Sequence, residues 1–169
     1  MLKVEHLVKV YPNGTQALRD VSFEVHRGDR IAIITNAGGP GTILTDLIVG
    51  KGRPLCRLSD EEIARLSAIL PQEWSHNNPI DIIGDACSQR FEAALNVVDT
   101  IETVGIVLLL VTPQMMTDTL AIAQLAERSW KKPLYPIFLG GEKMGEALEY
   151  LRKRKIPVFT TLEECASWL

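Results

Sequence analysis

The segment from Arg30 to Val49 constrains the fold more strongly than any other part of the chain. Ile31–Ile34 is a short apolar run typical of a buried strand, and Thr42–Val49 is predicted to begin a helix. The loop between them contains Gly38, Gly39 and Gly41. A strand, a glycine loop and a helix in this order point several backbone N–H groups at one place. The unpaired amides and partial positive charge of a first helical turn attract an anion to that place.

This loop therefore predicts a binding site for a phosphate-sized anion. Glycine suits such a site because it adopts positive φ freely and has no Cβ to hold a ligand away from the backbone. The residues predicted to bind the anion are Asn36, Ala37, Gly38, Gly39, Gly41 and Thr42. No Lys-Ser or Lys-Thr pair follows the glycines, so the loop is not a Walker A motif, and it lacks the dinucleotide spacing. The pattern leaves open a turn that binds nothing.

From residue 30 onward the chain alternates strand and helix signals, which is typical of a parallel sheet covered by helices. The run Val104–Val111 is apolar on both faces, as a central parallel strand requires. The predicted strands are Arg30–Thr35, Leu55–Leu58, Ile80–Ile83, Val104–Val111, Leu134–Leu139 and Ile156–Phe159. We predict a flavodoxin-like, doubly wound α/β domain. Ligands of such a domain contact the loops at the carboxyl ends of the strands, here Thr35–Thr42, Thr112–Thr117 and Asn78–Asp85.

Several helix starts are marked by capping residues. Ser59–Glu62 and Thr161–Glu164 fit the capping box, and Thr112-Pro113 predicts a cap followed by proline at the first helical position. One apolar helix face is predicted from the spacing of Met144, Ala147, Leu148 and Leu151. The basic run Arg152–Lys155 follows it, where cations complement the helix dipole.

The sequence predicts no catalytic residue and no metal site. Asp81 and Asp85 are either acids of a site or side chains that brace loops, and the residues alone leave both open. The histidines and cysteines are scattered and have no metal-ligand spacing: His6, His26, His76, Cys56, Cys87 and Cys165.

Composition excludes some function classes. A net charge of −3 gives no electrostatic reason to expect nucleic acid as a partner. The longest apolar run, Val104–Val111, is too short to cross a bilayer, and the first residues lack the apolar core of a signal peptide. An odd number of widely spaced cysteines suits reduced thiols, so we expect a cytoplasmic protein.

Residues 1–29 differ in kind from the rest of the chain. Leu2–Tyr11 and Val21–Val25 alternate in part between apolar and polar residues, and Pro12-Asn13-Gly14 is a strong turn signal. We expect a β-hairpin extension over residues 1–29, followed by an α/β domain over residues 30–169.

Several segments carry the residues of a known family: Thr35–Gly41, Trp74–Ala86, Thr112–Gln114, Lys132-Pro133, Gly140-Gly141 and Lys155–Phe159. Through them, residues 30–169 resemble the C-terminal flavodoxin-like domain of the NDP-forming acyl-CoA synthetases, which include acetate–CoA ligases and relatives of succinyl-CoA synthetase. In that family an acid, CoA and ATP give acyl-CoA, ADP and phosphate through an acyl phosphate and a phosphohistidine.

The resemblance implies ATP, CoA and Mg for the complete enzyme, with none of them bound by this chain alone. It also implies partner domains or subunits that carry the phosphohistidine, bind CoA and form an ATP-grasp. The family's phosphate lies between two helix N-termini, and the loop Asn36–Thr42 would supply one of them. None of the three histidines has the glycine- and alanine-rich setting of the family's histidine. The isolated chain is therefore not expected to make a thioester.

A second resemblance covers residues 1–34. The segment Leu2–Asp29 is similar to the opening of an ABC-transporter ATPase subunit, in which Tyr11 would stack on adenine. The Walker A lysine, the signature motif and the acidic Walker B end are missing, so ATP hydrolysis is not expected. Two resemblances in one chain indicate a hybrid, either a gene fusion or an engineered chimera.

Three hypotheses remain open at this stage. The chain is a ligase-type domain that offers half of a phosphate site, an ABC-type nucleotide-binding fragment, or an inert scaffold without activity. A hairpin separated from its original sheet would expose strand edges, so a homo-oligomer formed through these edges is one expected consequence.

Overall fold

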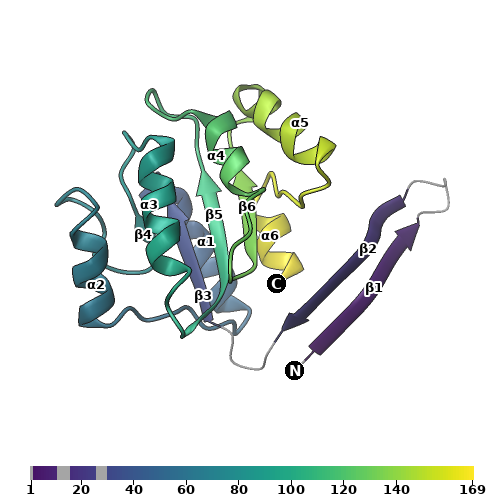
Figure 1. The fold of residues 1–169 in the computed structure, drawn as a ribbon, viewed down its shortest axis with the longest axis horizontal. Helices are drawn as coiled ribbons and strands as arrows, with labels where there is room; N and C mark the ends of the chain where they lie inside the picture. Colours follow the sequence, from purple (N-terminus) through teal and green to yellow (C-terminus); the bar gives the residue numbers. More distant parts are fainter. Residues whose placement is uncertain (1, 11–15, 26–29) are drawn as a thin grey trace.

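The computed structural model describes residues 2–10, 16–25 and 30–169. Two N-terminal strands, β1 (Leu2–Val10) and β2 (Gln16–Val25), pair antiparallel and form a two-stranded sheet of their own (Figure 1). The antiparallel pair agrees with the predicted hairpin. Tyr11, the predicted adenine contact, lies outside the described residues.

The rest of the chain is built on a four-stranded parallel sheet with the order β4-β3-β5-β6. Its strands are β3 (Arg30–Thr35), β4 (Ile80–Asp81), β5 (Val104–Val111) and β6 (Leu134–Phe138). Single parallel bridges extend the sheet at both edges, between Ile31 and Leu55 and between Ile137 and Phe159. β3 therefore lies inside the sheet, with β4 on one side and β5 and β6 on the other. This order confirms the predicted flavodoxin-like, doubly wound fold.

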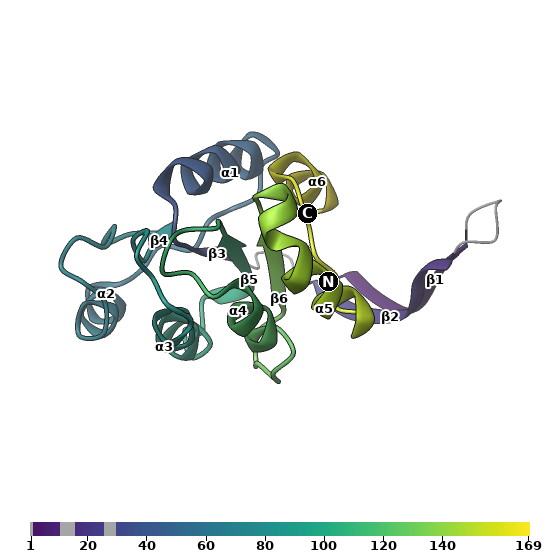
Figure 2. The ribbon, with the colours of Figure 1, turned by 90° about the horizontal axis from the view of Figure 1, so that it is seen from above.

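Helices cover both faces of this sheet. The described helices are α1 (Gly38–Gly50), α2 (Asp60–Ser67), α3 (Ser88–Val98), α4 (Thr119–Leu125), the 3₁₀ helix η1 (Gly141–Met144), α5 (Gly145–Lys153) and α6 (Leu162–Trp168). Figure 2 shows α1 and α6 together on one face, with α2 to α5 on the other. Within the described part of the chain, no helix combines the length and apolar character needed to span a bilayer.

The core is divided into two layers by the strands themselves. In β5, Leu108 and Leu110 pack with the residues of α1 and α6, whereas Val107 and Leu109 pack with those of α2 to α5. Alternate side chains of one strand thus enter opposite layers, as expected for an apolar strand with helices on both sides. The four predicted apolar positions preceding and within α5 are buried: Met144, Ala147, Leu148 and Leu151.

The capping predictions have mixed outcomes. Ser59 and Glu62 form the complete capping box of α2. Thr161 caps α6 by accepting from Glu164 N, but the Glu164 carboxylate accepts from Thr160 N, which is outside the box pattern.

The predicted cap at Thr112-Pro113 is wrong. The next helix, α4, begins at Thr119, and the Asp118 side chain caps it by accepting from Ala121 N. Thr112 does not cap a helix because its hydroxyl and its amide both donate to the side chain of Asn36.

Two predicted strands, Leu55–Leu58 and Ile156–Phe159, are reduced to single bridges at Leu55 and Phe159. Pro54 and Pro157 accompany these segments, and a proline nitrogen cannot donate to a sheet. At the Leu55 edge, a side chain also takes the place of further backbone pairing.

That side chain is Asn78, which completes the outer edge of β3. Its Oδ1 accepts from Ile33 N at 2.9 Å, and its Nδ2 donates to Ile31 O at 2.7 Å and to Cys56 O at 3.0 Å. The amide is only 7% exposed. It therefore fills the gap between the Leu55 bridge and β4, where Ile33 N would otherwise be buried without this partner; Ile31 O also accepts from Cys56 N.

We predict that Asn78→Ala lowers the free energy of unfolding by about 2–3 kcal/mol, because it removes the side-chain partner of Ile33 N and of Cys56 O in a buried place. Urea unfolding measures the change. The exposed side chain of Glu73 in the same connection offers a matched control, and Glu73→Ala should change stability by less than about 0.5 kcal/mol. Equal effects of the two substitutions would contradict this role of Asn78.

Candidate functional site

The candidate site lies where β3 ends and α1 begins. The helix starts at Gly38 and not at Thr42 as predicted, so the glycines form its first turn instead of a preceding loop. Ala37 is the N-cap residue, and its side chain makes no capping hydrogen bond. Pro40 occupies the third helical position, where a backbone N–H would have no partner within the helix.

Close packing explains two of the three first-turn glycines. A Cβ on Gly38 would lie 2.7 Å from Asp81 Oδ2, and a Cβ on Gly41 would lie 3.1 Å from Thr35 Cγ2 and 3.5 Å from Pro79 Cβ. Positive φ is not the reason, since Gly52, Gly140 and Gly141 are the glycines with positive φ among the residues that the structure describes. A Cβ on Gly39 would meet nothing within 4 Å. The start of α1 is thus pressed against the end of β4 while Gly39 remains open.

Two backbone amides at this point are available to a ligand. Ala37 N donates to Thr35 Oγ1 at 3.0 Å, and Gly41 N donates to Ala37 O at 3.1 Å. Gly38 N and Gly39 N have no partner among the described residues, and both residues are exposed. They also lie at the positive end of a 13-residue helix whose first turn contains no acidic residue.

Asn36 and Thr42, the other residues predicted to bind an anion, have partners within the protein. Thr42 Oγ1 donates to Gly38 O at 3.0 Å. Asn36 is 1% exposed, and its side chain bridges to the end of β5. Its Nδ2 donates to Thr112 O at 2.9 Å and to Thr117 Oγ1 at 3.1 Å, while its Oδ1 accepts from Thr112 N at 2.9 Å. These hydrogen bonds join the end of β3 to the loop after β5, and the amides of Gly38 and Gly39 take no part in them.

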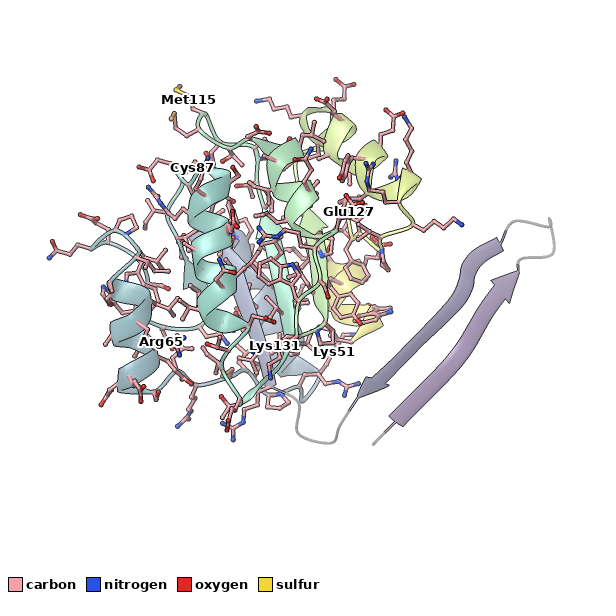
Figure 3. All side chains as sticks on the ribbon, viewed as in Figure 1. Lys51, Arg65, Cys87, Met115, Glu127 and Lys131 are labelled. Carbon is pink, nitrogen blue, oxygen red and sulfur yellow. The ribbon has the colours of Figure 1, made fainter. Side chains whose placement is uncertain are left out.

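The hydrogen bonds from Asn36 to Thr112 and Thr117 also hold the loop after β5. Thr117 N donates to Gln114 O at 3.2 Å, and Gln114 Nε2 donates to Thr112 Oγ1 at 3.1 Å. At its tip, Met115 is 99% exposed and points away from the protein (Figure 3). The structure thus brings the predicted segments 35–42, 78–85 and 112–117 to one edge of the sheet.

The two candidate acids have different roles in the structure. Asp85 pairs with Arg90, whose guanidinium also donates to Ile82 O at 3.0 Å. The hydrogen bond from Arg90 lowers the pKa of the Asp85 carboxyl. Asp81 accepts from Ile83 N at 3.0 Å through Oδ1, and its Oδ2 is the atom beside Gly38. Asp85 is therefore a brace, whereas Asp81 belongs to the candidate site.

The backbone conformation of Ile83 was not predicted from the sequence. Its φ is 71°, in the left-handed region that β-branched residues rarely adopt. Ile83 N donates to Asp81 Oδ1, and this hydrogen bond holds the carboxylate whose other oxygen lies beside Gly38. The proximity of Asp81 to the glycines was not predicted from the sequence either. It depends on the pairing of β4 with β3, which brings Asp81 beside Thr35, a residue 46 positions earlier in the chain.

Within residues 30–169, no group of three or more histidine, cysteine, aspartate or glutamate side chains is placed to hold a metal ion. What the edge offers to a ligand is therefore a pair of amide donors and one carboxylate acceptor.

Residues 31–167 match the Ligase-CoA domain family. The chain belongs to this family. The match covers the sheet and helices of the α/β unit, including the β3–α1 connection.

Proteins similar to this chain include two archaeal ligases. Acetate–CoA ligase [ADP-forming] I of Archaeoglobus fulgidus is 38% identical over 137 residues, which are 81% of this chain and 20% of the ligase. The alpha subunit of acetate–CoA ligase [ADP-forming] II of Pyrococcus furiosus is 31% identical over 148 residues, 83% of this chain and 32% of the subunit. The resemblance to NDP-forming acyl-CoA synthetases is thereby confirmed.

A solved structure shows the same fold. Acetyl-coenzyme A synthetase 1 of Candidatus Korarchaeum cryptofilum, in complex with phosphate and ADP, superposes with a TM-score of 0.72 at 26% identity. The superposition covers 83% of this chain and 31% of the synthetase. This Ligase-CoA domain thus spans about a fifth to a third of the length of these relatives.

The second resemblance is also confirmed. A phosphonates import ATP-binding protein of Bdellovibrio bacteriovorus is 47% identical over 45 residues, which are 26% of this chain and 17% of that protein. The similarity fits the ABC-type segment and covers only a small part of either chain.

The two adjacent exposed glycines give a stability test of the site's geometry. We predict that Gly38→Ala destabilises the domain, since the new Cβ would meet the Asp81 carboxylate. Gly39→Ala should be neutral or stabilise by up to about 1 kcal/mol, because alanine favours a helix and the space is open. Thermal unfolding of both variants measures the difference, and a Gly38→Ala variant as stable as Gly39→Ala would contradict the close approach of Asp81.

Proposed function

We propose that this chain serves as the Ligase-CoA domain of an ADP-forming acyl-CoA synthetase and that the start of α1 forms one wall of a phosphate site. The observation that carries the proposal is the pair of free amides on Gly38 and Gly39. Both N–H groups are exposed at the positive end of α1, at the carboxyl edge of the sheet, where α/β domains bind ligands. The phosphate bound to a solved relative supports the choice of anion.

The wall is incomplete as a binding site. Two amide donors contribute about 0.3–1 kcal/mol per charge–dipole contact when exposed to water, which is too little for tight binding. The carboxylate of Asp81 beside Gly38 weakens the attraction for an anion further. A second set of donors from another domain is therefore required, and it would close around the phosphate from the exposed side of Gly39.

The partners that we propose are the remaining domains or subunits of the synthetase. This chain spans a fifth to a third of its relatives, one of which is an alpha subunit by name. We propose that the phosphohistidine, the CoA-binding domain and the ATP-grasp domain that the family resemblance implies, with ATP, CoA and Mg, belong to those other parts. Because the complete enzyme would use ATP and CoA, we place it in the cytoplasm.

We further propose that residues 30–169 form the functional domain and residues 1–29 a separate extension. The family match begins at residue 31, and β1 and β2 share no sheet with β3. A thioester product is not expected from the chain alone, since none of its three histidines has the glycine- and alanine-rich setting of the family's histidine.

The similarity to an ATP-binding protein favours nucleotide binding as a second candidate function. In the described structure, however, β3 leads into Gly38–Gly50, which contains no lysine, and β5 leads into Thr112-Pro113 in place of an acidic pair. A nucleotide would thus lack both the lysine and the acid that hold its phosphates and metal in such ATPases.

Amide NMR titration with inorganic phosphate tests the proposal. At fixed ionic strength, we predict shifts centred on Gly38 and Gly39, with a dissociation constant in the millimolar range or weaker, on the order of −4 kcal/mol at most. Gly39→Ala keeps the amide and should retain the shifts. Gly39→Asp adds a negative charge at the same place and should abolish them.

ATP titrated in parallel separates the two candidate functions. Shifts at Tyr11 and its neighbours with ATP, together with a silent α1, would favour the ABC-type interpretation. Equal phosphate shifts in Gly39→Ala and Gly39→Asp would show that the anion binds elsewhere and would overturn the proposed site.

A further inference from the structure

The carboxylate of Asp81 is an unusual neighbour for a phosphate site. Its Oδ2 lies so close to Gly38 that a Cβ there would be 2.7 Å away. A negative charge at this point stabilises the start of α1, which has no acidic residue or side-chain cap of its own. The same charge repels any anion that approaches the amides of Gly38 and Gly39. A ligand of this edge must therefore satisfy both the donors and the carboxylate.

The orientation of the carboxylate leaves one oxygen available. Asp81 Oδ1 accepts from Ile83 N at 3.0 Å. Asp81 N donates to Ser75 Oγ at 3.0 Å, so the backbone is held as well. Oδ2 has no hydrogen-bond partner in the described part of the chain. The protein thus fixes one carboxylate oxygen and leaves the other free beside Gly38, the first of the two residues with free amides.

We infer that Asp81 is a specificity-determining residue that makes the half-site select phosphate over sulfate. The inference rests on the proposed phosphate site. Hydrogen phosphate keeps a proton at neutral pH, so one of its oxygens donates to Oδ2 while others accept from Gly38 N and Gly39 N. Sulfate has the same shape and charge but no proton, so its oxygens meet the carboxylate without a hydrogen bond. An anion without the donor leaves Oδ2 unpaired and repelled.

We expect only a moderate loss of binding affinity for an anion that carries no proton, such as sulfate. Sites that pair with a ligand's hydroxyl reject analogues that lack it by large factors when the site is buried. Gly38 and Gly39 are exposed, and water can reach Oδ2, so we expect a preference of roughly tenfold for phosphate in the isolated chain. The preference would increase when a partner domain excludes water from the site.

The experiment compares anions in amide NMR titrations of the full chain at neutral pH and fixed ionic strength. Phosphate and arsenate carry a proton under these conditions, whereas sulfate and selenate do not. In the natural sequence, shifts at Gly38 and Gly39 should require roughly tenfold less phosphate or arsenate than sulfate or selenate. This arm needs no substitution, so it remains decisive even if a variant fails to fold.

Asp81→Asn supplies the second arm. The variant removes the charge, keeps an oxygen that accepts from Ile83 N, and adds a donor, so the sulfate affinity should rise to within about twofold of the phosphate affinity. Asp85→Asn removes a charge from the same edge that pairs with Arg90, and it should leave the preference unchanged.

Each outcome has a definite meaning. Equal affinity for protonated and unprotonated anions in the natural sequence, or an unchanged preference in Asp81→Asn, would overturn the role of Asp81 while leaving the phosphate site in place. In that case Asp81 only caps α1. Absence of shifts at Gly38 and Gly39 with every anion would overturn the proposed phosphate site itself.

Discussion

The carboxyl edge of the sheet depends on one buried amide, the side chain of Asn36. After β3 the chain turns into α1 on one face, and after β5 it continues toward α4 on the other, so backbone pairing ends where the two strands part. Asn36 continues the pairing with hydrogen bonds to Thr112 and Thr117. Doubly wound folds often bind ligands in this crevice. Here Asn36 bridges the two strands at this point, and the candidate site lies at the start of α1, where the Asp81 carboxylate of β4 approaches Gly38.

The outer side of β3 depends on a second amide, that of Asn78, which leads directly into β4 and Asp81. Both asparagines replace backbone pairing with side-chain pairing, one at each side of the same strand. Gly38 and Gly41 then allow α1 to begin against Asp81, Thr35 and Pro79. The free amides of Gly38 and Gly39 are consequently held by a rigid frame, which is what a phosphate site needs from one of its walls.

The sequence was sufficient for the fold because strands such as Val104–Val111 are apolar throughout and alternate with amphipathic helices. It was insufficient where tertiary contacts override local signals. Thr112 looks like a cap, yet Asn36 occupies its hydroxyl, and the glycines look like a loop, yet they form a helical turn. The place of the anion site was predicted from Asn36–Thr42, whereas the free amides of Gly38 and Gly39 and the approach of Asp81 became visible only in three dimensions.

A crystal structure of the full chain soaked in phosphate, with sulfate excluded, tests the central claim most directly. We predict a phosphate with oxygens about 2.7–3.2 Å from the nitrogens of Gly38 and Gly39 and a third oxygen within hydrogen-bond distance of Asp81 Oδ2. Phosphate bound elsewhere on the surface, with these two amides contacting only water at saturating concentration, would contradict it.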